Sequence, residues 1–205
     1  MKLDFKLSTK VEHGYLLIPE PAKELAEFPD VYDRVCSVIY HCTMVANEPV
    51  KKCISLSAKD ATHIRSALCE FVGIEDLLKQ LYPTLSNNSF AIYKSENPVL
   101  HMIKLLRNYN VHISNSQLSQ KSMKVRTKLD NFQEFDVTVG YISNLSLESL
   151  KLMYSANNYT DSQLIRMIEV FECEQHEFGV TTLIQKAVID YSQHLAKVLH
   201  SNQIS

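Results

Sequence analysis

Residues 97–113, NPVLHMIKLLRNYNVHI, combine the start signal of a helix with a long apolar stripe. Asn97 can cap a helix, and Pro98 is tolerated in the first helical turn because its missing N–H would be unpaired there anyway. Apolar residues then recur at the three- and four-residue spacing of a helix with one buried face: Val99, Leu100, Ile103, Leu106, Val111 and Ile113. The stretch therefore predicts a helix that ends near residues 114–117 and carries Arg107, Asn108 and His112 in its later turns.

Two earlier segments show the same periodicity. The first runs from Val31 to about Asn47 and is followed by Pro49. The second runs from Ser57 to Tyr82, where Ser57 and Asp60 resemble a capping box, and Gly73 indicates a kink or a close helix contact. Since a polar loop joins it to the helix at residue 98, the two long helices are expected to form an antiparallel pair.

Residues 122–142 change to a period of two. Met123, Val125, Thr127 and Leu129 lie on one face and Lys124, Arg126 and Lys128 on the other, and residues 135–141 repeat the alternation after the turn DNFQ. This pattern predicts a β-hairpin inserted between helices.

Helical patterns return after the hairpin. Ser146 and Thr160 are the expected N-caps of two helices, and Gly179 separates the second of these from a last helix that reaches about His200. We therefore expect one mainly α domain over residues 1–205, a bundle of about six helices with an N-terminal arm (1–30) and a β-hairpin insertion near 122–142.

Composition narrows the class of protein. The 205 residues are 45% hydrophobic and 21% charged, which is typical of a folded globular chain, and the net charge of −2 gives no long-range attraction to polyanions. Five cysteines at irregular spacing indicate reduced thiols. We expect a cytoplasmic protein without a membrane partner, because charges interrupt the first residues and no apolar run approaches the roughly 20 residues of a membrane span.

Arg107, Asn108 and His112 suggest chemistry on phosphate. Asn108 and His112 are four residues apart and share a helix face, and Arg107 is long enough to lean toward it. A guanidinium can bind a phosphate oxygen, an imidazole titrates near neutral pH, and an amide can orient either. The alternative is structural, with Arg107 a snorkelling arginine, Asn108 a surface residue and His112 an exposed group near the helix end.

The same segment resembles the catalytic helix of the HEPN superfamily, whose motif is Arg-Asn, three variable residues and His, preceded by apolar residues. The match is Arg107, Asn108 and His112, and it covers about 20 residues closely and the helical architecture more broadly. The N-terminal arm and the hairpin depart from compact members of the family.

The resemblance implies a metal-independent endoribonuclease without a cofactor. In such an enzyme two copies of the motif helix face each other in a homodimer, and the ribose 2′-hydroxyl attacks the adjacent phosphate. His112 would transfer protons, Arg107 would stabilise phosphate charge, and Asn108 would orient the histidine or a phosphate oxygen. RNA would be the substrate, in RNA turnover, host defence or a toxin–antitoxin pair with an antitoxin or other regulatory protein as partner.

Two other interpretations stay open. The chain can be a non-catalytic HEPN-like module that binds a nucleotide or a protein through the same residues, or an unrelated helical regulator in which RNYNVH is a coincidence.

Further candidates for RNA contact lie nearby. Tyr109 can stack a base or belong to the core. The basic residues Lys121, Lys124, Arg126 and Lys128 can follow an RNA backbone or pair with Glu134 and Asp136 across the hairpin. The groups Cys36, His41, Cys42 and Cys173, His176 lack the paired spacing of a zinc site, so no metal is expected.

Overall fold

The computed structural model of the chain describes residues 2–15, 17–46, 55–112, 117–126 and 134–203; the side chains of Val111, His112, Gln117, Val125 and Gln203 lie outside the description. Within these ranges the chain forms seven α-helices, three 3₁₀ turns and one two-stranded antiparallel sheet. In chain order they are η1 (Lys23–Glu27), α1 (Pro29–Thr43), α2 (Leu56–Leu81), α3 (Asn87–Phe90), η2 (Ile92–Lys94), α4 (Pro98–His112), β1 (Gln117–Arg126), β2 (Glu134–Ser143), α5 (Leu147–Lys151), η3 (Tyr154–Asn158), α6 (Asp161–His176) and α7 (Gly179–Gln203).

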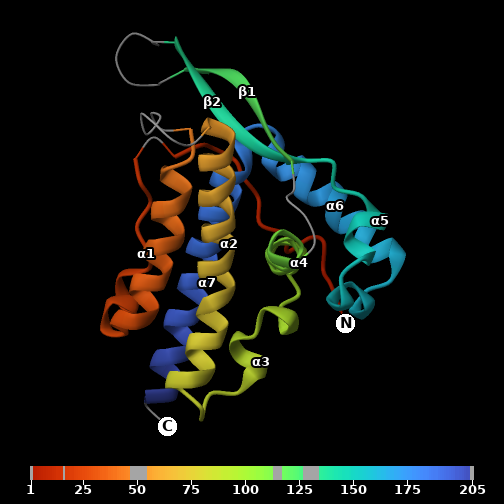
Figure 1. Cartoon of the computed structure of the whole chain (residues 1–205). Coiled ribbons are helices and arrows are strands. Elements are labelled where there is room, and N and C mark those ends of the chain that lie inside the picture. Colours follow the sequence, from red (N-terminus) through yellow and green to blue (C-terminus); the bar gives the residue numbers. More distant parts are fainter. Residues whose placement is uncertain (1, 16, 47–54, 113–116, 127–133, 204–205) are drawn as a thin grey trace.

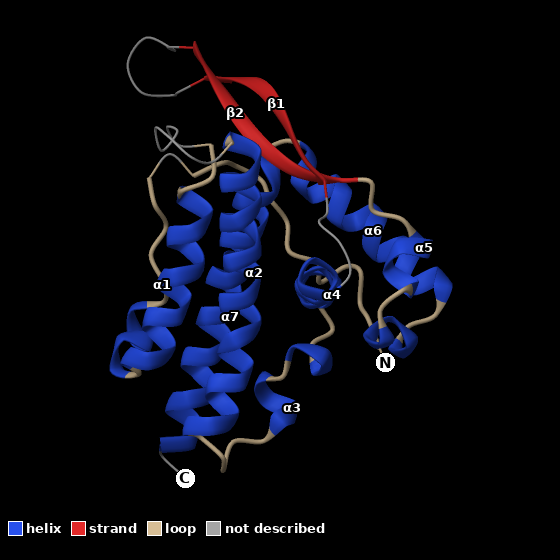
Figure 2. Cartoon of the chain, in the orientation of Figure 1, coloured by secondary structure: helices blue, strands red, loops and turns tan. Residues whose placement is uncertain are grey.

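Helices dominate the architecture, and the hairpin lies across one end of them. Figures 1 and 2 show α1, α2 and α7 side by side, with α5 and α6 on the other side of α4 and the β1–β2 ribbon above. The prediction of a mainly α bundle with an inserted hairpin is confirmed.

One apolar core joins the long helices. Each contributes residues at helical spacing, and Phe71 of α2 stacks on Tyr191 of α7 with ring centroids 5.8 Å apart. Ile103 and Leu106 of α4 are fully buried in this cluster, as their spacing predicts. The apolar stripe of the opening segment therefore fixes α4 inside the bundle.

Two helix boundaries differ from prediction. Helix α1 ends at Thr43, before Asn47, because Ala46 has a left-handed φ of 60° and its N–H donates to Asp60 Oδ1 at 3.1 Å. The N-cap of α2 lies two residues earlier than predicted, since the Oγ of Ser55 and not that of Ser57 accepts the cap hydrogen bond from the Ala58 N–H.

Asp60 is therefore not a capping residue. It is fully buried, and its second oxygen accepts from Gln120 Nε2 of β1 at 3.0 Å. Since the same carboxylate also accepts from the Ala46 N–H, it joins the end of α1 to the base of the hairpin.

The predicted antiparallel pairing of α2 and α4 is wrong. Figure 1 views α4 almost along its axis while α2 runs in the plane, so the two helices cross steeply. The buried carboxylate of Glu75 on α2 fixes the crossing, because it accepts from Lys104 Nζ of α4 at 2.6 Å and from the Ile92 N–H of η2 at 3.3 Å. The segment between the helices turns the chain through α3 and η2 before α4 begins.

The hairpin is longer than the predicted 122–142. Its register pairs Gln117 with Ser143 and Arg126 with Glu134. Gln175 of α6 holds its base, donating to the Ile142 carbonyl at 2.7 Å and accepting from the Ile142 N–H at 2.9 Å. Gly179 starts α7 with φ of +81°, and a Cβ there would lie 2.8 Å from the Gly140 carbonyl oxygen, so the predicted helix break needs glycine.

The later caps match their predictions. Ser146 accepts from the Ser149 N–H at the start of α5, and Thr160 accepts from the Gln163 N–H at the start of α6. Both are capping boxes, in which the third residue bonds back to the cap.

The N-terminal arm runs along the outside of the helices without forming a strand in its described residues. It is held at Thr9, whose Oγ1 accepts from Asn97 Nδ2 at 3.0 Å, and at Lys10, whose Nζ lies 2.8 Å from Glu174 Oε1. Because Asn97 also accepts from the Val99 N–H at 2.9 Å, the arm is tied directly to the cap of α4.

Candidate functional site

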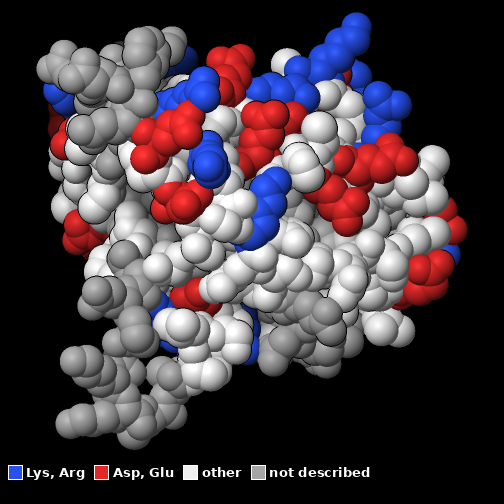
Figure 3. Space-filling view, turned by 90° about the horizontal axis from the view of Figure 1, so that it is seen from above, with Lys and Arg blue, Asp and Glu red and all other residues white. Residues whose placement is uncertain are grey.

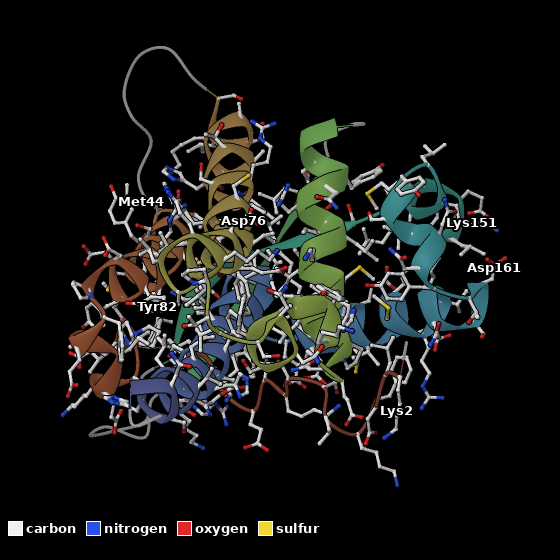
Figure 4. All side chains as sticks on the ribbon, turned by 90° about the horizontal axis from the view of Figure 1, so that it is seen from below. Lys2, Met44, Asp76, Tyr82, Lys151 and Asp161 are labelled. Carbon is white, nitrogen blue, oxygen red and sulfur yellow. The ribbon has the colours of Figure 1, made fainter. Side chains whose placement is uncertain are left out.

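The later turns of α4 carry the predicted site residues. The backbone is helical through His112, so Asn108 and His112 lie one turn apart on the same face, as predicted. Figure 4 shows α4 between α2, which carries Asp76, and the α5–α6 segment, which carries Lys151 and Asp161. The side chain of His112 lies outside the described part of the structure.

Asn108 has a partner on a distant segment. Its side chain is partly buried, and its Nδ2 donates to the Ser155 Oγ of η3 at 3.2 Å. This bond fixes the amide against η3 and leaves its Oδ1 as an acceptor. Sequence reasoning missed Ser155, because a serine in a short 3₁₀ turn 47 residues away gives no periodic signal.

Arg107 differs from the other cation of its helix. Lys104 is neutralised by the buried Glu75, whereas Arg107, which is partly buried, has no hydrogen bond or ion pair with any described residue. Burial alone would raise the pKa of Glu75, but hydrogen bonds from Lys104 and Lys79 outweigh it and hold that pKa below its usual range. Among the described side chains of α4, Arg107 is therefore the permanent charge left to bind an outside anion.

His101, two turns before Asn108, was also missed, and its role is structural. It is fully buried, with Nε2 2.7 Å from the Ser95 carbonyl oxygen and Nδ1 2.8 Å from the Tyr159 hydroxyl oxygen. Because a carbonyl only accepts, Nε2 carries the proton and Nδ1 accepts from Tyr159. Burial lowers the pKa of His101 and raises that of Tyr159 to about 12, so both groups stay neutral at pH 7.

Tyr109 lies partly buried against the core cluster. This position agrees with the interpretation of Tyr109 as a core residue and limits the ring face available to a base.

The basic residues of the hairpin are not gathered at α4. Arg126 pairs with Glu134 across the strands, Lys124 lies opposite Asp136, and Lys121 Nζ donates to the His176 carbonyl at 2.7 Å at the end of α6. The contacts of Arg126 and Lys121 favour cross-strand and helix-end pairing of these two residues over a continuous RNA track. Lys128 lies outside the described residues.

The described basic residues of the hairpin are also spread along β1. Arg126 lies nine residues beyond Gln117, roughly 30 Å along an extended strand. On the face seen in Figure 3, acidic side chains lie among the basic ones of the described residues, and several basic side chains lie along one edge.

The cysteines and histidines form no cluster of metal ligands in the described ranges, where no three His, Cys, Asp or Glu side chains converge. Cys42 is buried in α1, and its burial raises the pKa of its thiol, so it behaves as a small core residue. Cys173 of α6 is exposed.

No protein-family model matches the chain, and neither a curated protein nor a solved structure shows significant similarity to it. None of the helices in the described ranges combines the length and the apolar character needed to cross a bilayer.

Proposed function

We propose that the chain is a HEPN-like, metal-independent endoribonuclease whose site is the C-terminal part of α4. The observation that carries the proposal is Arg107, a partly buried guanidinium without a described partner, beside an amide that η3 holds in place. The resemblance of Arg107, Asn108 and His112 to the HEPN motif adds a histidine one helical turn after Asn108.

Cleavage would use the ribose 2′-hydroxyl as the nucleophile. Its oxygen bonds to the adjacent phosphorus as the bond from phosphorus to the 5′-oxygen breaks, which leaves a 2′,3′-cyclic phosphate and a 5′-hydroxyl. One base accepts the 2′ proton, and one acid donates a proton to the departing 5′-oxygen.

In a dimer, His112 can supply both the base that accepts the 2′ proton and the acid that protonates the 5′-oxygen. A single His112 cannot accept and donate a proton at the same moment, whereas two motif helices facing each other across a twofold axis supply a neutral and a protonated imidazole to one cleft. The Arg107 guanidinium stabilises the charge that builds on the phosphate oxygens, and Asn108 orients a phosphate oxygen or the histidine.

The first test compares variants on single-stranded RNA in EDTA. We expect His112→Ala to lower the cleavage rate about 10²–10⁴-fold, the usual contribution of a general acid or base. His13→Ala, which removes an exposed histidine of the arm, is the matched control and should cleave like the parent chain. Cleavage that persists in His112→Ala would exclude this mechanism.

A second candidate function is a non-catalytic nucleotide- or protein-binding module. The bond between Asn108 and Ser155 favours it, because a motif amide whose Nδ2 is already bonded inside the protein also suits a fixed binding surface. Binding of RNA by the parent chain without any cleavage would support this alternative.

A further inference from the structure

An exposed aromatic side chain lies beside the candidate site. Tyr154, the first residue of η3, is 90% exposed, more than any other large hydrophobic side chain in the described ranges. Leu152, two residues earlier, is 67% exposed. Exposure of this extent leaves the ring face of Tyr154 open to solvent.

The backbone that carries Tyr154 is nevertheless well anchored. Met153 and Ala156 on either side are 5% and 2% exposed, and the Tyr159 hydroxyl bonds to His101 inside the core. The segment is therefore fixed against α4, and Tyr154 is directed outward by its position in the turn.

The same segment also contacts a motif residue of α4. Ser155, the next residue, accepts from Asn108 Nδ2 at 3.2 Å, and Arg107 precedes Asn108 on α4. In Figure 4 the α5–α6 side of the molecule, which carries the labelled Lys151 and Asp161, lies next to α4. An open aromatic ring and an uncompensated guanidinium thus flank one hydrogen-bonded contact between η3 and α4.

We propose that Tyr154 is a base-stacking residue for single-stranded nucleic acid, with Arg107 binding a phosphate of the same strand. This inference rests on the proposed function and names the side chain that holds a base near the cleavage site. Stacking on an aromatic ring tolerates every base, because each base has a π face, and contributes about 1–3 kcal/mol per base.

Charge decides between a nucleic acid and an apolar protein partner. A hydrophobic partner surface that covered Arg107 together with Tyr154 and Leu152 would remove the water around the guanidinium without supplying a counter-ion. A nucleotide brings a phosphate together with a flat base, so it satisfies both groups. Tyr154 also offers the ring face that the partly buried Tyr109 does not.

The chain contains no tryptophan, so a single Tyr→Trp change creates one specific fluorophore. We would prepare Tyr154→Trp and, as a matched control, Tyr40→Trp at an exposed tyrosine of α1. The ligand is a short single-stranded RNA with 2′-O-methyl groups, which cannot be cleaved by 2′-hydroxyl attack. We expect this RNA to quench tryptophan emission in Tyr154→Trp and to leave Tyr40→Trp unchanged.

Affinity provides the second measurement. Tyr154→Ala should weaken binding of the same RNA about 5- to 150-fold, the equivalent of one stacked base, and Tyr154→Phe should retain it. Unchanged affinity in Tyr154→Ala, or no binding by the parent chain, would overturn the inference. A changed oligomeric state in Tyr154→Ala with unaltered RNA affinity would also overturn it and assign Tyr154 to a dimer contact.

The uncleavable ligand separates this inference from the proposed function. Tyr154-dependent binding by a parent chain that never cuts ordinary RNA would contradict the ribonuclease and support the stacking residue. Efficient cleavage of RNA by the parent chain, together with an RNA affinity that does not change in Tyr154→Ala, would support the ribonuclease and contradict the stacking role of Tyr154.

Discussion

The two cations of α4, one in each half of the helix, differ in their partners. In the first half, His101 is fully buried with both ring nitrogens bonded, and Lys104 is neutralised by Glu75. In the second half, Arg107 is partly buried and has no partner among the described residues. Some polar side chains of a core helix thus have hydrogen-bond or ion-pair partners within the protein, and others are left to bind a ligand. The presence of such a partner separates the two groups better than the type of residue does.

Removing a buried side chain of α4 should have the largest effect on stability. Leu106 is fully buried, and Leu106→Ala should lower the free energy of unfolding by about 2–5 kcal/mol, because it removes apolar contacts and leaves a cavity. Denaturant unfolding followed by circular dichroism measures this loss. A loss below about 0.5 kcal/mol, the size of ordinary surface changes, would contradict the burial of α4.

Arg107→Ala tests the second half of the helix. We expect the RNA cleavage rate to fall about 10²–10³-fold, as when one group that stabilises transition-state charge is lost, while the free energy of unfolding changes by less than about 0.5 kcal/mol. Arg107→Lys should recover only part of the rate, because an ammonium cannot bind two phosphate oxygens in the fork geometry of a guanidinium. Strong destabilisation with intact cleavage would make Arg107 structural like His101.

Tyr159→Phe tests the first half without changing its shape. The variant leaves His101 Nδ1 buried without its donor, so the free energy of unfolding should fall by about 1–3 kcal/mol. Tyr154→Phe is the matched control, since its hydroxyl lies on an exposed ring and should cost nothing measurable. Equal stabilities of the two variants would show that the buried hydrogen bond contributes little.

Acid should weaken the first half of α4 before it affects Glu75. The pKa of His101 is lower in the folded chain than its unfolded value near 6.5, so the unfolded chain binds more protons between these values. The contribution of neutral His101 to the free energy of unfolding is fully present above pH 6.5. It is lost as the pH falls from 6.5 toward the folded pKa of His101, by at most about 1.4 kcal/mol per pH unit for one proton.

The pH dependence is measured by unfolding the parent chain and His101→Gln from pH 7.5 to 5. The variant should show a shallower slope, and the slope that remains includes His63, whose pKa is lowered by burial and by the neighbouring His41. Identical slopes would show that His101 is not the titrating group.

Ser155→Ala should have the smallest effect. It removes one hydrogen bond from Asn108, so the cleavage rate should fall by the equivalent of about 0.5–1.5 kcal/mol, or roughly 2- to 13-fold, with little change in stability. Comparison of the initial cleavage rates of Ser155→Ala and of the neighbouring Ser149→Ala measures it. A rate unaffected by Ser155→Ala would mean that the Asn108 orientation does not matter for cleavage.

Local signals in the sequence predicted most elements of the fold. Caps at Ser146 and Thr160 and the helix break at Gly179 are set by neighbouring residues, and they lie where predicted. The start of α2 was misplaced because Ser55 and Ser57 are both good caps, and only the structure shows which hydroxyl meets the Ala58 N–H.

Contacts between distant segments could not be predicted in the same way. The crossing of α2 and α4 depends on Glu75 meeting Lys104, 29 residues away, and the support of Asn108 comes from Ser155. The roles of Arg107, Asn108 and His112 in chemistry stay a prediction, which came from the motif and not from its three-dimensional surroundings.

The product ends of RNA cut in EDTA show whether the ribose 2′-hydroxyl is the nucleophile. The parent chain should leave 2′,3′-cyclic phosphate and 5′-hydroxyl ends, identified by mass spectrometry, because the 2′-hydroxyl attacks without a metal. Products with 3′-hydroxyl and 5′-phosphate ends, or cleavage that stops when EDTA is added, would contradict the account.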